Sequence, residues 1–186
     1  MPPAVKTDKK AIIDGVMTII ERDGWGAVSA RSVANELSIS TQPIYREFKD
    51  MNEVRDAAIE RGLEIFVQYL RGDALDQSVS YVMFAMERAN LFNFLFRGKH
   101  YEYGGLDELS HKLVNGTEII DKLEKITGLT REKVYRVHLG VWMALHGLAA
   151  MSADNRVAID KDEIKRFTRE MTSALTAYYR DRTDGE

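Results

Sequence analysis

The chain of 186 residues contains no cysteine. This absence excludes disulfide bonds, thiolate metal sites and enzymes that use a thiol nucleophile. The sequence also has no run of about 18 consecutive apolar residues, so it predicts no membrane-spanning helix. The N-terminal segment MPPAVKTDKK lacks the apolar stretch of a secretory signal, so we expect a cytoplasmic protein with no membrane partner.

An excess of positive charge is absent as well. The chain carries 26 Lys and Arg against 29 Asp and Glu, a formal net charge of −3. Proteins that bind nucleic acid gain much of their affinity from Lys and Arg side chains that displace counterions from phosphates. The deficit lies after residue 50, because residues 1–50 hold seven basic and seven acidic side chains. Charge therefore permits DNA binding only if the basic residues of this first part gather on one face.

The patterns that mark most enzymes are missing too. The sequence has no nucleophile and base arrangement, no glycine-rich phosphate loop and no cluster of metal ligands. His146 has no second His or carboxylate three or four residues away, a spacing at which helical residues share a metal ion. We therefore expect a protein that is not an enzyme and that uses no metal or cofactor.

Helical periodicity is present along almost the whole chain, with no strand pattern and no repeat. Apolar residues recur at spacings of three and four, as in Ile12, Ile13, Val16, Met17 and Ile20. The composition is 45% apolar, enough to form a core. The sequence predicts an all-α protein of about nine helices, covering residues 9–22, 30–37, 41–48, 50–71, 75–89, a short segment ending at 96, 107–127, 130–151 and 160–179.

Residues 28–48, VSARSVANELSISTQPIYREF, predict two short helices joined by a tight turn. Ser29 is placed to cap the first helix, and Ser40 is placed to cap the second. Pro43 falls in the first turn of the second helix, where its missing amide costs nothing. Ile44 and Phe48 are predicted to be buried, which leaves polar side chains toward solvent. This arrangement is typical of a helix-turn-helix that reads DNA.

The first fifty residues resemble the tetracycline-repressor (TetR) family of bacterial transcriptional regulators. The resemblance covers an apolar first helix that ends at Gly24-Trp25, followed by VSARSVANELSISTQPIYREFKDMNEV. Ser38 stands where the family usually has Gly, and Pro43 is unusual inside the recognition helix. The segment WMALHGL, residues 142–148, resembles the Trp-His-Gly motif of one subgroup. The resemblance implies a three-helix DNA-binding head, residues 1–50, and a helical ligand-binding and dimerisation domain, residues 51–186.

The second helix of a helix-turn-helix enters the major groove, with its first residues against base edges and neighbouring groups on phosphates. Candidate base contacts are Thr41, Gln42, Pro43 and Arg46. Candidate phosphate contacts are Ser29, Arg31, Ser40, Tyr45 and Lys49, and the resemblance supports Tyr45 and Lys49 in particular. The expected partner is a double-stranded DNA operator. Each of these residues has an alternative interpretation as an ordinary solvated side chain.

A homodimer is expected for two reasons. Two recognition helices spaced about 34 to 36 Å apart read a palindrome, whereas one gives little specificity. The segment from Val141 to Met151 is apolar almost all round and therefore needs burial on every side. The predicted interface residues are Gly140, Ala144, Gly147, Phe167, Met171, Leu175 and Tyr178. The alternative is that the small residues among them only pack within one chain.

The remaining helices are expected to hold a small-molecule effector that is largely apolar or aromatic. The candidate pocket residues are Met83, Phe84, Met86, Phe92, Phe94, Phe96, Tyr101, Tyr103, Trp142, Met143 and His146, and the competing interpretation of each is ordinary core packing. The function predicted is a repressor that the effector releases from DNA. Two alternatives stay open, a DNA-binding scaffold of the same fold that responds to a protein partner, and a helical interaction protein without DNA contact.

Overall fold

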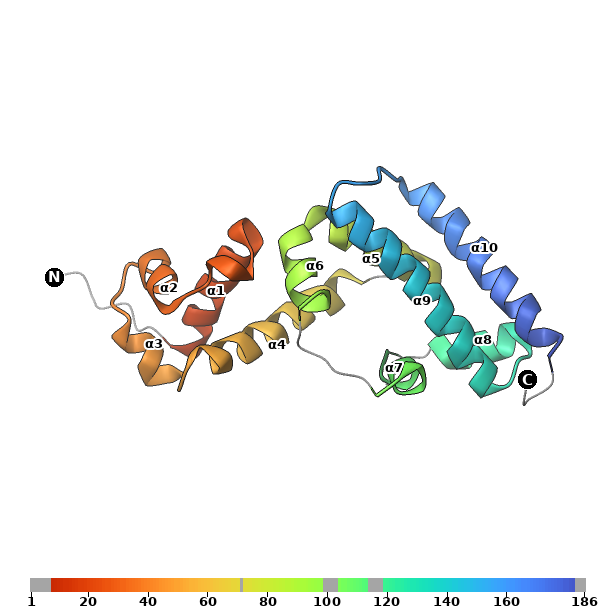
Figure 1. Ribbon diagram of the computed structural model, residues 1–186, viewed down its shortest axis with the longest axis horizontal. Coiled ribbons are helices and arrows are strands. Elements are labelled where there is room, and N and C mark those ends of the chain that lie inside the picture. The colour runs from red at the N-terminus through yellow and green to blue at the C-terminus, as the bar shows by residue number, and fades with distance from the viewer. Residues whose placement is uncertain (1–7, 71, 99–103, 114–118, 183–186) are drawn as a thin grey trace. The chain divides into compact units, whose positions relative to one another are not determined.

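The computed structural model describes residues 8–70, 72–98, 104–113 and 119–182. These residues form α-helices and one short 3₁₀ helix, with no strand among them (Figure 1), which confirms the all-α class. The described residues contain ten α-helices rather than about nine. The difference arises where one helix was predicted over 107–127, because two helices stand there, α7 (Leu106–Leu113) and α8 (Ile119–Thr127). Residues 114–118 lie outside the described residues.

The helices group into two compact units. The first comprises Met1–Tyr69 and Glu87–Gly98, and the second comprises Leu70–Met86 and Lys99–Glu186. The sequence predicts a boundary after residue 50 between a DNA-binding domain and a sensing domain, and this functional division stays a prediction. By packing, however, the helices at 51–69 and 89–96 belong to the same unit as the three α-helices of residues 9–47.

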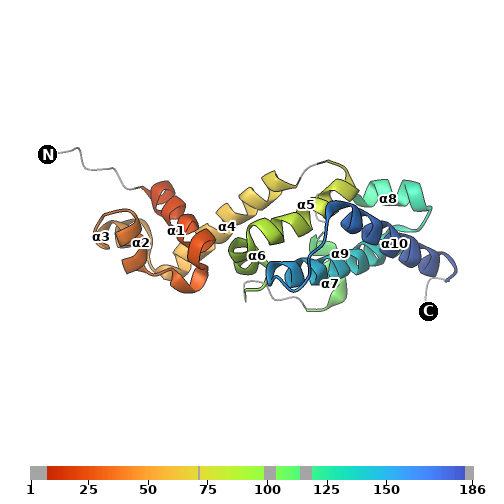
Figure 2. The same cartoon turned by 90° about the horizontal axis from the view of Figure 1, so that it is seen from above.

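The described residues of the first unit form six helical elements, namely α1 (Lys9–Asp23), the 3₁₀ helix η1 (Trp25–Ala27), α2 (Ala30–Glu36), α3 (Gln42–Glu47), α4 (Met51–Tyr69) and α6 (Ala89–Phe96). The predicted apolar stripe of α1 is buried, with Ile12, Val16 and Ile20 fully covered. A Cβ atom at Gly15 would lie 2.9 Å from Cδ2 of Leu37, just after α2. Gly15 therefore lets the end of α2 approach α1, and α2 and α3 lie together beside that helix (Figure 2).

Helix α4 packs closely against α6 within the first unit. A Cβ atom at Gly62 would lie 2.8 Å from Cδ2 of Leu95, so only glycine fits without a shift. Glycine disfavours the interior of a helix, and this close approach gives the reason for its presence here. The rings of Phe66 and Phe96 meet edge to face nearby, with centroids 5.0 Å apart.

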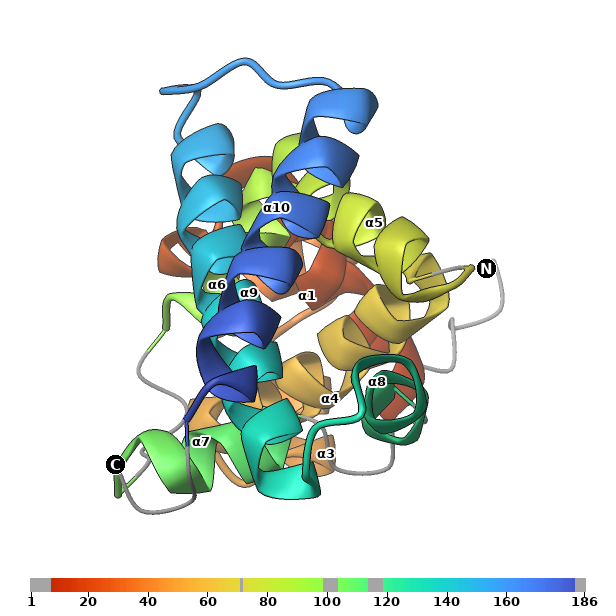
Figure 3. The ribbon, with the colours of Figure 1, turned by 90° about the vertical axis from the view of Figure 1, so that its right-hand side faces the viewer.

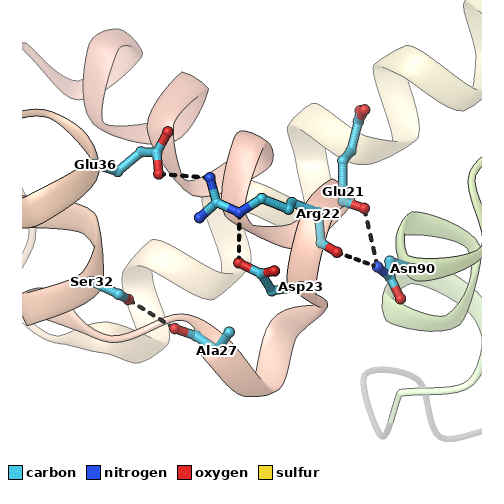
Figure 4. A network of polar contacts seen from close by, with 7 residues as sticks. All are labelled: Glu21, Arg22, Asp23, Ala27, Ser32, Glu36 and Asn90. Atoms are coloured by element: carbon cyan, nitrogen blue, oxygen red, sulfur yellow. Dashed lines mark hydrogen bonds and ion pairs between the residues drawn. The ribbon is translucent and has the colours of Figure 1, made fainter.

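Helix α6 is also bound to the end of α1. The Asn90 side-chain amide donates to the carbonyl oxygens of Glu21 at 3.0 Å and Arg22 at 3.1 Å (Figure 4). These carbonyls belong to the last turn of α1, where no intrahelical donor remains for them. The half-buried ring of Trp25 stacks on Phe94 with centroids 5.1 Å apart, so this tryptophan packs against α6.

Five helices occur in the part of the second unit that the structure describes, namely α5 (Ala74–Glu87, with Glu87 assigned to the first unit), α7, α8, α9 (Arg131–Ala153) and α10 (Lys161–Arg180). Helices α9 and α10 run side by side (Figures 1 and 3). They approach closely at Gly140, where a Cβ atom would lie 2.7 Å from Cδ1 of Leu175. Ile120, Leu129, Val134 and Val137 form a buried cluster that joins α8 to α9.

The side chain predicted to cap α2 does so, whereas the one predicted to cap α3 does not. Ser29 accepts from the Ser32 amide at 3.1 Å, and Asp160 accepts from the Glu163 amide at 2.8 Å. Ser40 does not cap α3, because Thr41 occupies the N-cap position and makes no side-chain cap bond. Helix α7 begins at Leu106, one residue before the predicted start.

Candidate nucleic-acid interface

The turn between α2 and α3 is a Schellman motif. The Ile39 amide donates to the Ala34 carbonyl at 2.9 Å, and the Ser38 amide donates to the Asn35 carbonyl at 3.1 Å. Ser38 has φ of 54°, in the left-handed region. A residue with a Cβ pays about 1 to 2 kcal/mol for this conformation, which explains why glycine suits the position better. The turn fixes the direction in which α3 leaves α2.

Helix α3 has only six residues and is held by two apolar side chains. Ile44 is 1% exposed and Phe48 is 3% exposed, which confirms their predicted burial. Pro43 stands in the first turn of the helix, as the sequence predicts. A helix this short is not stable alone, so its position depends on these anchors.

The side chains predicted to contact bases lie on the other side of α3. Thr41, Gln42 and Arg46 are exposed, and Pro43 is half-buried. Gln42 and Arg46 are four residues apart, so they are neighbours on one helix face. The structure therefore brings together a donor and acceptor amide and a guanidinium on a surface open to solvent. Their contacts with bases stay a prediction.

The residues predicted to contact phosphates are also exposed, namely Ser29, Arg31, Ser40, Tyr45 and Lys49. Tyr45 is 54% exposed, a high value for an aromatic side chain. The Ser29 hydroxyl already accepts from the Ser32 amide, so its first role is to start α2. Their roles at a DNA backbone stay predictions.

Two charged groups beside α3 were not among the candidates. Lys9 Nζ lies 5.1 Å from the centroid of the Phe48 ring and 3.3 Å from a carboxylate oxygen of Glu53. The other carboxylate oxygen of Glu53 accepts from the Lys49 amide at 2.7 Å. These bonds, that of Lys49 first, lower the pKa of Glu53. No local sequence signal joins Lys9 to Lys49, because only tertiary packing brings α1 to the end of α3.

The predicted pocket residues fall in both compact units. Phe92, Phe94 and Phe96 belong to the first unit, and the second holds Met83, Phe84, Met86, Trp142, Met143 and His146. Phe84 and Phe92 are fully buried, which suits core packing, whereas Met86 and Met143 are exposed. Tyr101 and Tyr103 lie outside the described residues. A pocket made by this set stays a prediction.

One polar cluster in the second unit includes a residue that the sequence did not single out. The Tyr81 hydroxyl lies 2.8 Å from Nδ1 of His146. The rings of Trp142 and His146 stack with centroids 5.0 Å apart. Burial raises the pKa of Tyr81, although a hydrogen bond from Trp142 opposes that shift. Tyr81 was missed because 65 residues separate it from His146.

The predicted interface residues differ in how much of each is available to a second chain. Gly140 packs against Leu175 of the same chain, and Leu175 also contacts the buried cluster of α8 and α9. At Gly147, by contrast, a Cβ atom would find no other atom within 4 Å. Tyr178 is 48% exposed, whereas Ala144, Phe167 and Met171 are half-buried. An interface role for these residues stays a prediction.

Neither a metal site nor a membrane-spanning helix occurs among the described residues. In residues 8–70, 72–98, 104–113 and 119–182, no group of three or more His, Cys, Asp or Glu side chains is arranged to hold a metal ion. Within those ranges, no helix combines the length and the apolar character needed to cross a membrane.

Comparison with known proteins points to a distant relative. No protein-family model matches the chain. An uncharacterized HTH-type transcriptional regulator of Mycobacterium tuberculosis is 24% identical over 157 residues, which cover 78% of this chain and 70% of that protein. The similarity extends well beyond a helix-turn-helix alone, and it supports a regulator of transcription.

Proposed function

We propose that this protein is a transcriptional regulator of the tetracycline-repressor type that binds DNA through α3. The observation that carries the proposal is the two-sided character of this helix. Ile44 and Phe48 hold it from one side, while Gln42 and Arg46 are exposed on the other. A short helix that is fixed by its own core and carries bidentate polar groups outward suits the major groove. The relative named as an HTH-type regulator supports the same function.

The proposed contacts follow from the chemistry of the exposed groups. Gln42 matches the N6 and N7 edge of adenine, and Arg46 matches O6 and N7 of guanine, at about 1 to 3 kcal/mol of discrimination each. Pro43 offers an apolar contact to a thymine methyl group. Lys49, Arg31 and the Tyr45 hydroxyl bind phosphates and fix the register of the helix.

Two copies of the chain read a palindromic operator in this proposal. The contact surface is the exposed side of α9, where Met143 and Met151 are each 48% exposed and Gly147 lies between them with open space beside it. These residues are four apart, so they form one apolar line along the helix. Tyr178 of α10, also 48% exposed, is a further candidate for contact with the second copy. Burying this line against a second copy gains free energy in proportion to the apolar area covered.

The second unit holds the effector in this proposal, and the effector releases the repressor from DNA. A small molecule shifts the equilibrium only if it binds one arrangement of the protein better than the other. Aromatic and methionine side chains, with the Tyr81 and His146 pair as a polar anchor, suit a flat and largely apolar molecule.

The first test is selection of duplex DNA from a random library by the wild-type protein, followed by fluorescence anisotropy with the selected duplex. We expect a palindromic sequence and a loss of about tenfold or more in affinity for Arg46→Ala and Tyr45→Ala. Asp56→Asn, an exposed change on α4, is the matched control and keeps the affinity within about twofold. Failure of the wild type to enrich any duplex contradicts the proposed function.

The sensing role needs its own test. Native mass spectrometry of protein purified from its own host is expected to show a bound small molecule, and removing that molecule is expected to change operator affinity. A protein that binds its operator and carries no molecule responds to something other than a small effector, such as a protein partner.

A further inference from the structure

Glu47 is an unexpected residue on a helix that faces DNA. It is the one acidic residue of α3, Gln42–Glu47, and it follows Arg46 directly. A carboxylate near a phosphate backbone opposes the binding that Lys and Arg promote. In a head whose first fifty residues carry no net charge, this cost is not negligible. The position of the Glu47 side chain, beside Arg46, indicates a role that could offset this loss of affinity.

The Glu47 carboxylate bonds to the side chain of the proposed guanine reader. Arg46 Nε donates to Oε1 of Glu47 at 3.1 Å. The Glu47 side chain is 27% exposed and that of Arg46 is 63% exposed. The more buried partner has less freedom to move, so the carboxylate restrains the guanidinium rather than the reverse. The restraint acts on the plane of the guanidinium, because that group is rigid and flat.

The edge of the guanidinium used in this bond matters for base recognition. A partner at Nε restricts the orientations that the plane of the two terminal nitrogens can take. That terminal pair is the fork that matches O6 and N7 of guanine. A side chain already held in a suitable plane loses less conformational freedom when it binds, and it fits acceptors in other directions less well. An exposed ion pair contributes little to the stability of the fold, so the expected effect of the Arg46–Glu47 pair is to orient the guanidinium.

We propose that Glu47 is a positioning residue that orients Arg46 toward guanine, and that it lowers affinity for DNA in general while raising selectivity for the operator. The inference rests on the proposed function, since it requires that α3 reads DNA. The negative charge of Glu47 weakens binding to any duplex, whereas its bond to Arg46 favours the operator. Affinities for a scrambled duplex and for the operator therefore separate the two effects.

The experiment uses the full-length protein and the duplex that the wild type selects from a random library. Affinities are measured for that duplex, for a copy in which 7-deazaguanine replaces each guanine and so removes N7, and for a scrambled duplex. The proteins are the wild type, Glu47→Ala, Glu47→Gln, Arg46→Ala and the charge control Asp56→Asn. Circular dichroism melts establish that each variant is folded.

The expected result is a loss of selectivity together with a gain in general affinity. For Glu47→Ala, the scrambled duplex binds a few-fold more tightly, and the preference for guanine over 7-deazaguanine falls about tenfold, toward that of Arg46→Ala. Glu47→Gln is intermediate, because its amide oxygen still accepts from Nε. Asp56→Asn keeps the guanine preference of the wild type.

Two results overturn the inference and differ in what else they affect. In the first, Glu47→Ala keeps the full guanine preference while Arg46→Ala loses it. Glu47 then has no positioning role, and the proposed function still stands. In the second, the wild-type protein selects no duplex, which contradicts both the role of Glu47 and the proposed function.

Discussion

Ser38 and His138 show how single residues in this fold depend on their surroundings. Ser38 holds a left-handed conformation that the turn before α3 requires, although its side chain disfavours it. His138, on α9, has its Nδ1 atom buried with no hydrogen-bond partner in the described part of the chain. Burial lowers the pKa of His138 to about 4. The sequence does not reveal the disfavoured backbone angle of Ser38 or the buried Nδ1 of His138, because backbone angles and burial arise from packing.

The His138 pKa predicts a loss of stability in mild acid. Above about pH 6.5 the imidazole is neutral in both the folded and the unfolded chain, so it has no effect on the free energy of unfolding. As the pH falls from 6.5 toward 4, the unfolded chain takes up a proton that the folded chain does not. We expect this group to cost about 2 kcal/mol between pH 7.5 and pH 5, and the loss to level off below pH 4.

Urea unfolding followed by circular dichroism at several pH values measures this loss. His138→Gln is expected to flatten the dependence of stability on pH in this range. His111→Gln, at an exposed histidine, is the matched control and keeps the wild-type slope. An equal slope in the wild type and in His138→Gln means that this imidazole is not the cause.

At the scale of elements, the sequence predicted most helices because their apolar periodicity and capping residues agree. Asp160 and Glu163 form a capping box at the start of α10, and Gly128, with φ of 68°, follows the end of α8. Contacts between helices were harder to predict. Asn90 on α6 binds carbonyls of α1 that precede it by 68 and 69 residues, and nothing in the local pattern around Asn90 points to them.

Replacement of Asn90 tests how far α6 holds the end of α1. Asn90→Ala leaves two carbonyls in the last turn of α1 without this donor, and we expect a loss of about 1 to 2 kcal/mol in stability. Hydrogen exchange is expected to speed up at the Gly24 amide, which bonds to the Ile20 carbonyl in the same turn.

Asn93→Ala is the control for this change, because the Asn93 side chain bonds to Arg97 near its own helix. Hydrogen exchange in the last turn of α1 is expected to match the wild type in that variant. If Asn90→Ala also leaves exchange at Gly24 unchanged, the bonds of Asn90 do not determine the stability of that turn.

At the scale of the whole molecule, the proposed dimer depends on the apolar residues that α9 leaves exposed. The apolar segment from Val141 to Met151 predicted that burial must come from several sides. The structure supplies part of that burial from the same chain, since Leu145 and Ala149 of this segment are buried. Met143, Gly147 and Met151 remain exposed. The proposed interface therefore keeps Gly147 from the predicted set and adds Met151 and Met143, the second of which the sequence assigned to the pocket.

Met143→Glu tests the proposed dimer. A carboxylate buried in an apolar interface costs several kcal/mol, so we expect monomers in sedimentation equilibrium at micromolar concentration. The loss of the dimer is expected to lower the affinity for the operator, because one recognition helix contacts only half of a palindrome.

Ile126→Glu provides the comparison. Ile126 is 80% exposed on α8 and lies outside the proposed interface, so the same chemical change there is expected to leave the dimer intact. A monomeric wild type, or a Met143→Glu protein that remains dimeric, counts against this surface as the interface.

The sequence by itself determined the helical class, most helix positions and the division of α3 into anchoring and exposed residues. These features follow from apolar spacing, side-chain caps and the properties of proline and glycine, all of which act within a few residues along the chain. Tertiary structure alone decided that Lys9 lies beside Phe48, that Asn90 caps α1, that Tyr81 meets His146 and that Leu175 fills the space at Gly140. Such pairs are distant in sequence and are selected by the close packing of whole helices, where volume and hydrogen-bond partners must be satisfied together.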